Sequence, residues 1–133
     1  MLPPSLFLGV AMKVIKAAHR MSGDARPPQG RFQGHAMQQT LHQTSEETRG
    51  SFVRFEAGAH THWHQHSGGQ LIYIVEGVAR VQAWGEQLHS LTVGDTVIAP
   101  PDEKHWHGAG PDGPMTQLAV TSGKVTWLED VAD

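Results

Sequence analysis

GAHTHWHQHSGGQLIYIVEG, residues 58–77, is the stretch of sequence that decides the fold. Side chains at positions i and i+2 of a β-strand point to the same face of a sheet, so His64 and His66 should lie side by side. A Gly-Gly pair then turns the chain and places Gln70 at the head of an apolar run typical of a buried strand. Later in the chain, PPDEKHWH at residues 100–107 supplies a third imidazole, that of His105.

These four residues predict a metal site. Neutral imidazole suits Zn, Fe, Ni and Cu, whereas a carboxamide oxygen is a harder ligand. Structural zinc sites seldom use glutamine, and four protein ligands around a six-coordinate ion would leave two positions open. The alternative is that the histidines are sheet residues with local hydrogen bonds and that the Gln70 amide only holds one of them. Convergence of residues from two distant segments favours the metal.

Two further histidines are candidates for proton transfer. His62 would share the inward face with His64 if the strand is already regular there, and would then act as a general base. If the chain is still a loop so soon after Gly58, His62 is solvated, and the spacing favours this alternative. His107 has the same facing as His105, and either moves a proton or packs at the barrel end. Facing arguments also predict five pocket-lining residues: Ser51, Val53, Gln117, Ala119 and Thr121.

The chain has 133 residues, enough for one domain with a single core, and its 15 glycines and 8 prolines suit short strands joined by turns. The expected strands are 14–17, 35–43, 50–56, 60–66, 70–75, 79–84, 87–91, 96–99, 105–108 and 115–121, and residues 126–131 are expected to form one helical turn. Strands this short without helical periodicity indicate an all-β antiparallel sandwich or barrel.

The facing of one strand also predicts a partner. If Gln70 points into the barrel, Ile72 and Ile74 do so too, and the apolar side chains of Leu71 and Tyr73 face outward. Such a face needs a cover, so we expect a homodimer.

Composition excludes several classes of protein. A net charge of −3 without a basic run argues against nucleic-acid binding. No apolar stretch is long enough to span a membrane as a helix, and residues 1–12 are expected to be a disordered or edge-packing leader. The absence of cysteine excludes disulfides and thiolate ligands, which fits a cytoplasmic protein.

The two histidine segments resemble the two motifs of the cupin superfamily. The first, G-x5-H-x-H-x3-4-E-x6-G, is matched by Gly58, His64, His66 and Gly77, with Gln70 in place of the glutamate. The second, G-x5-P-x-G-x2-H-x3-N, is matched by Gly94, Pro100 and His105, with Asp102 and Ala109 as departures. The resemblance implies a single cupin domain, a β-barrel of the jelly-roll type, over residues 1–133.

Residues 50–130 are also similar to a subgroup of small bacterial cupins that includes manganese-dependent hydroxynitrile lyases. The resemblance implies Mn or Fe as the metal, with Zn or Ni as further options, and a small oxygenated substrate. It suggests cyanohydrin cleavage. An oxygenase reaction at iron and a metal-bearing isomerase or epimerase are the other enzymatic alternatives. The subgroup's lyases carry a pocket histidine where this chain has Gln117. The alternative from another class is a non-catalytic cupin that binds or senses a small molecule.

Overall fold

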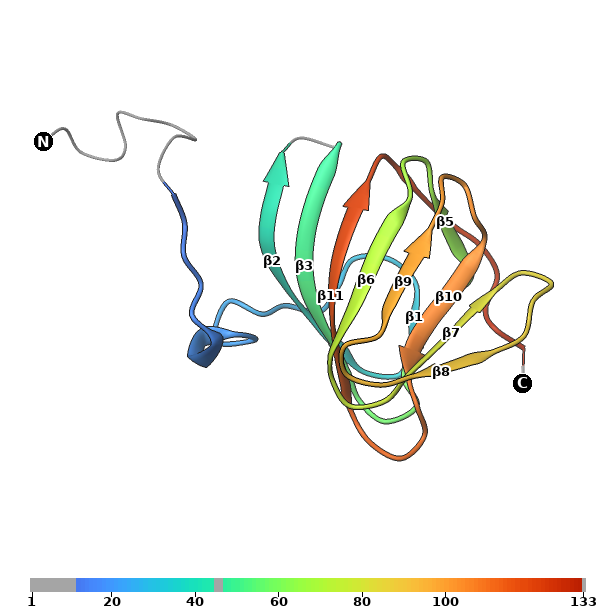
Figure 1. Cartoon of the computed structure of the whole chain (residues 1–133), viewed down its shortest axis with the longest axis horizontal. Coiled ribbons are helices and arrows are strands. Elements are labelled where there is room, and N and C mark those ends of the chain that lie inside the picture. The colour runs from blue at the N-terminus through green and yellow to red at the C-terminus, as the bar shows by residue number, and fades with distance from the viewer. Residues whose placement is uncertain (1–11, 45–46, 133) are drawn as a thin grey trace, which may run out of the picture.

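The computed structural model describes residues 12–44 and 47–132, whose strands form two curled antiparallel sheets arranged as a half-barrel (Figure 1). One sheet has the order β2-β3-β11-β6-β9; the other follows β1-β4-β10-β5-β12, with β7 also pairing with β10 and β8 with β7. The strands are β1 (Phe32–Gln33), β2 (Ala36–Thr44), β3 (Thr48–Phe55), β4 (His60–Thr61), β5 (His64–His66), β6 (Gln70–Glu76), β7 (Ala79–Ala83), β8 (His89–Leu91), β9 (Thr96–Ala99), β10 (His105–Ala109), β11 (Met115–Ser122) and β12 (Val125–Trp127). The predicted all-β antiparallel architecture is confirmed.

The inner face of the five-stranded sheet forms much of the core. Along β6, Gln70, Ile72 and Ile74 are buried while Leu71 and Tyr73 are exposed, as the alternation predicted. Phe55 and Met115 face each other across β3 and β11 and are almost completely buried. The end of the sheet that contains these two residues is therefore apolar, whereas buried polar side chains, among them Thr121 and Ser51, lie at the end near Gln70.

The outer face of the same sheet carries an apolar patch. Leu71 lies between Val120 on β11 and Ile98 on β9, and Tyr73 is next to Leu118. Ile98 is 68% exposed and Tyr73 41%. This is the face for which a partner subunit is expected, and the homodimer remains a prediction.

Four predicted elements differ from the structure. Residues 14–17 form no strand; the chain there is irregular and leads into a short 3-10 helix, η2 (Ala17–His19). Residues 126–131 contain no helical turn, because Val125–Trp127 instead pairs with β5. The strand expected at 60–66 is broken into β4 and β5. Residues 22–34, for which no strand was expected, are mostly loop but contain β1 and a bridge between Arg26 and Gln38 of β2.

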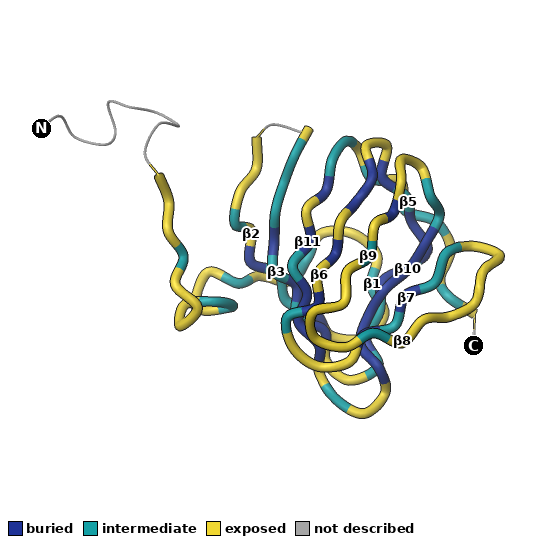
Figure 2. Tube along the Cα trace, viewed as in Figure 1, coloured by how far each residue is buried: buried dark blue, intermediate teal, exposed yellow. Residues whose placement is uncertain are grey.

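The start of the described chain extends away from the sheets. Residues 12–18 are largely exposed (Figure 2), whereas Arg20 returns to the five-stranded sheet and pairs with Glu76 at 3.0 Å. Residues 1–11, which make up nearly all of the predicted leader, lie outside the described part of the chain. Within the described residues, no helix combines the length and apolar character needed to cross a membrane.

Candidate metal centre

The three predicted ligand histidines meet inside the half-barrel. His64 and His66 are buried on either side of the half-buried Gln65 along β5, and His105 begins β10 directly opposite His64. All three side chains are buried, and their candidate ligand nitrogens lie within 4.8 Å of one another. Antiparallel pairing of β5 with β10 thus brings together residues 39 or more positions apart in sequence.

Main-chain carbonyls orient two of the rings. The Nδ1 atoms of His64 and His105 lie 2.9 Å and 2.8 Å from the carbonyl oxygens of His62 and Glu103. A carbonyl can only accept, so Nδ1 carries the proton in each ring and Nε2 keeps a free lone pair. His66 differs, since neither of its nitrogens has a hydrogen-bond partner among the described residues.

Gln70 completes the group from β6. Its Nε2 donates to Thr121 Oγ1 at 3.0 Å, which turns Oε1 toward His105 Nε2, also at 3.0 Å. With the amide assigned in this orientation, two lone-pair atoms face each other with no proton between them. A cation between such atoms would satisfy both. The donor set of three imidazoles and one carboxamide oxygen therefore fits a divalent metal.

Burial keeps these imidazoles neutral. It lowers the pKa of His64 to about 3, helped by the neighbouring His105 and His66, while the bond to the His62 carbonyl works in the opposite direction. It lowers the pKa of His66 to about 4, again with a contribution from His105. The pKa of His105 is also lowered, mainly by burial. Neutral imidazole is the form that binds metal, so the ligands are ready at pH 7.

A cavity of about 1070 Å³ opens beside these residues and is lined by His64, His66 and Gln70. The predicted lining residues Ser51, Val53, Gln117, Ala119 and Thr121 all border it, as facing along β3 and β11 required. His105 lies behind them and borders a second, smaller cavity of about 110 Å³. A ligand in the large cavity would therefore approach the metal centre from the side of β3 and β11.

His107 also lines the large cavity and is buried. Burial, followed by the nearby His64, His105 and His66, lowers its pKa well below the usual value, and Gln117 acts weakly in the other direction. Gln117 is near enough for that influence, yet neither its Oε1 nor His107 Nδ1 has a well-formed hydrogen bond among the described residues. Both atoms are buried, so these two side chains keep unused hydrogen-bonding capacity beside the metal centre.

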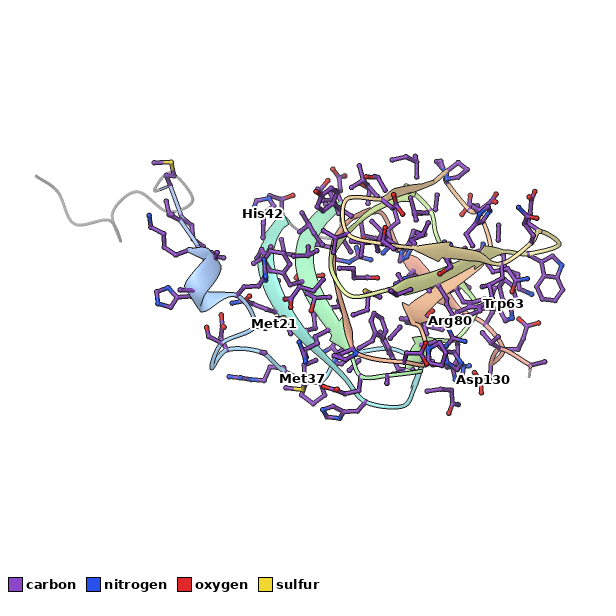
Figure 3. The ribbon with its side chains drawn as sticks, turned by 60° about the horizontal axis from the view of Figure 1, so that its bottom comes forward. Met21, Met37, His42, Trp63, Arg80 and Asp130 are labelled. Carbon is purple, nitrogen blue, oxygen red and sulfur yellow. The ribbon has the colours of Figure 1, made fainter. Side chains whose placement is uncertain are left out.

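His62 is not placed as the shared-face prediction required. The strand breaks at residues 62–63, so His62 does not border the cavity and instead approaches the Leu128 carbonyl at 3.4 Å and Gln33 at 3.3 Å. Asp130 lies 3.7 Å from its Nε2. Figure 3 shows Asp130 on the same flank of the molecule as Trp63 and Arg80. His62 therefore lies in a break between strands, as in the alternative that the spacing favoured, and a role for it as a general base stays a prediction.

Comparison with known proteins agrees with this geometry. Residues 51–121 match the family described as cupin domain. The chain belongs to the cupin family. Over 88 residues it is 43% identical to an (R)-mandelonitrile lyase from Granulicella tundricola, a match covering 63% of this chain and 67% of that one.

Solved structures extend the likeness to nearly the whole cupin chain. A cupin-like protein from Thermotoga maritima is 30% identical and superposes with a TM-score of 0.74 over 92% of both chains. The polyketide cyclase RemF from Streptomyces resistomycificus has a TM-score of 0.71 at 18% identity, covering 90% of this chain and 87% of that one. At this identity the second likeness concerns the fold alone.

Trp127 and Arg49 are among the cavity residues of this cupin that were missed from sequence. Trp127, on the unpredicted β12, places its ring 4.8 Å from that of His64 and 5.7 Å from that of Phe32. The alternation of Val125 and Trp127 after Gly123 was the signal for that strand. Arg49 was missed because the strand was expected to begin at residue 50. Arg49 lies two positions before Ser51, and this spacing was the signal that the two side chains share a face.

Proposed function

We propose that this cupin is a metal-dependent lyase that cleaves a small cyanohydrin into an aldehyde and hydrogen cyanide, and that also catalyses the reverse reaction. The observation that carries the proposal is the convergence of three buried, neutral imidazoles beside a large cavity. The (R)-mandelonitrile lyase relative supports the choice of reaction.

His64, His66, His105 and Gln70 would hold the metal, with Mn or Fe favoured by the family resemblance and Zn or Ni as further options. A bound divalent ion would act as a Lewis acid that polarises the substrate hydroxyl or carbonyl. Because all four ligands are neutral, none of them reduces the formal charge of that ion.

The proton transfers require a group of the chain itself, and His107 is the candidate. Its neutral imidazole lines the cavity and can take the proton from the substrate hydroxyl through a ring nitrogen. The electron pair of the O–H bond then forms the carbonyl, and the carbon–carbon bond breaks with its electron pair on cyanide. The imidazolium returns the proton to cyanide, so the enzyme ends unchanged. Gln117 can donate or accept a hydrogen bond beside His107 but cannot carry this proton.

The apolar part of the cavity fits the substituent of an aryl or alkyl cyanohydrin. Phe32, Phe55, Val53 and Trp127 all border the cavity. Packing against these side chains would hold an aromatic substituent, so that the reacting carbon of the cyanohydrin points toward the histidines.

A second candidate is a non-catalytic cupin that binds a small molecule at the same centre. The observation that favours it is Gln117, a buried cavity residue that cannot transfer protons, at the position where the lyase subgroup carries histidine. Binding would use the same metal and cavity, and only turnover separates the two functions.

The test begins with protein freed of metal by a chelator and reloaded with Mn²⁺, Fe²⁺ or Zn²⁺, with bound metal measured by elemental analysis. Cleavage of mandelonitrile is followed by benzaldehyde absorbance, and oxygen consumption with catechols tests the oxygenase alternative. His64→Ala should lose stoichiometric metal and activity, whereas His89→Ala, on exposed β8, should keep both. His107→Asn should keep the metal and lose at least roughly 100-fold in kcat.

Stoichiometric metal without turnover of any cyanohydrin would favour the binding function. Failure to bind metal under all loading conditions would reject both functions.

A further inference from the structure

Arg49 is a charged residue on the inner face of the half-barrel. Along β3 it shares its facing with Ser51, Val53 and Phe55, and it borders the large cavity together with them. Arg49 pairs with Thr121 on β11, and Thr121 pairs with Gln70 on β6. A single row across three neighbouring strands therefore leads from the guanidinium to a metal-ligand candidate.

The charge of Arg49 has no acidic partner among residues 12–44 and 47–132. The one hydrogen bond found for its guanidinium is donated by Nη1 to the Gly123 carbonyl oxygen at 2.9 Å. Burial lowers the pKa of Arg49, but guanidinium stays protonated in proteins. A partly buried cation without a counter-charge is unfavourable on its own, and an anion placed beside it removes that cost.

The cavity around Arg49 is biased toward anions. Its other charged lining residues are two exposed cations, Arg26 and Lys124, and one acid, Asp24. The Asp24 carboxylate already accepts a hydrogen bond from Gln39 at 3.0 Å. Arg49 is also one of the groups that lower the pKa of His66, which places its charge close to the metal centre. The charged side chains that line the cavity therefore carry a net positive charge even without a metal ion.

We propose that this cavity binds a small carboxylate, with Arg49 holding the carboxylate and the molecule's hydroxyl or carbonyl group directed toward His66. Adjacent strands are about 4.8 Å apart, so the Arg49 and Gln70 backbones, two strands apart, are separated by roughly 10 Å, which a small hydroxy or oxo acid can span with the two side chains. The planar guanidinium fork matches a carboxylate in two parallel hydrogen bonds. The assignment of the reacting end rests on the proposed function; the anion site does not.

The test compares mandelate with methyl mandelate, which has the same ring and hydroxyl but no charge. Calorimetric titrations of the full chain, both metal-free and Mn²⁺-loaded, give the ratio of the two affinities. We expect mandelate to bind more tightly in both forms, and Arg49→Gln to weaken mandelate roughly 10- to 100-fold while leaving the ester unchanged. Arg49→Lys, which keeps the charge but loses the fork, should fall between the two.

Arg54→Gln is the matched control, because Arg54 lies on the same strand but faces outward and pairs with Glu56 at 3.6 Å. It should leave the preference for mandelate intact. Near-UV circular dichroism establishes that each variant is folded, and Arg49→Lys provides the comparison if Arg49→Gln is not.

An unchanged preference for mandelate in the Arg49 variants would overturn the proposal, as would equal binding of acid and ester by the wild type. A preference for mandelate that requires Mn²⁺ and is unchanged in the Arg49 variants would mean that the metal binds the carboxylate. That result would also overturn the proposal. If the metal-loaded wild type does not cleave mandelonitrile but still prefers mandelate through Arg49, the lyase function is contradicted and the anion site is supported.

Discussion

The buried histidines predict a steep loss of stability of the metal-free protein in mild acid. The pKa values of His64 and His66 fall from 6.5 in the unfolded chain to about 3 and about 4 in the fold. Below pH 6.5 the unfolded chain therefore binds protons that the folded protein does not, so the free energy of unfolding decreases as the pH falls. The decrease starts near pH 6.5 and continues until the pH passes the folded-state values.

The size of this effect follows from the two shifts. Between pH 7.5 and pH 5 each of the two histidines removes about 2 kcal/mol, or about 4 kcal/mol together. That is a large part of the 5–15 kcal/mol typical of a domain. The pKa of His105 and of His107 is lowered in the same direction, so these residues add to the loss.

Urea unfolding of the metal-free protein at pH 7.5, 6.5, 5.5 and 5 measures this loss, and most carboxylates titrate below that range. In His64→Gln/His66→Gln the decrease between pH 7.5 and 5 should be about 4 kcal/mol smaller than in the wild type, whereas the exposed-site variant His89→Gln should match the wild type. A wild-type stability that stays constant down to pH 5, or a double variant as acid-sensitive as the wild type, would refute the claim that these rings are buried and neutral.

Three further predictions concern the cavity, the ligand set and the apolar patch. Trp127→Ala removes a ring that packs on His64 and Phe32, and should lower the free energy of unfolding by about 2 kcal/mol in urea; an unchanged value would mean that β12 contributes little. Gln70→Glu adds a charged ligand and should strengthen Mn²⁺ binding at least about tenfold in competition with a fluorescent chelator, while destabilising the metal-free protein. Weaker Mn²⁺ binding would show that position 70 does not coordinate. The double variant Tyr73→Lys/Ile98→Lys should be monomeric by light scattering where the wild type is a dimer, and a monomeric wild type would contradict the expected assembly.

Much of the site could be predicted from sequence because side chains at alternate positions of a regular strand point to the same face of the sheet. His64 and His66 share a face by that rule, and the same rule correctly pointed Gln70, Ile72 and Ile74 inward. The meeting of His105 with His64 required pairing of distant strands, which no local pattern specifies. It came from the resemblance to cupin motifs rather than from the periodicity.

The failures have a common physical cause, which is that parity holds only while a strand is regular. At residues 62–63 the chain leaves the ladder: the Trp63 amide donates to the Glu129 carbonyl and the Leu128 amide donates to the Trp63 carbonyl. The C-terminal segment that provides these bonds is distant in sequence, so the break could not be read locally. The same pairing turns residues 125–127 into a strand where a helical turn was expected.

The main-chain acceptors of His64 and His105 have a consequence for how this pocket can vary. Each ring is oriented by the main-chain carbonyl of the residue two positions before it, and every amino acid supplies such a carbonyl. Mutational libraries at residues 62 and 103 should therefore preserve the aim of the rings as long as the backbone path persists. The side chains that line the cavity can then change during evolution to fit new molecules, while the orientation of the His64 and His105 rings is retained.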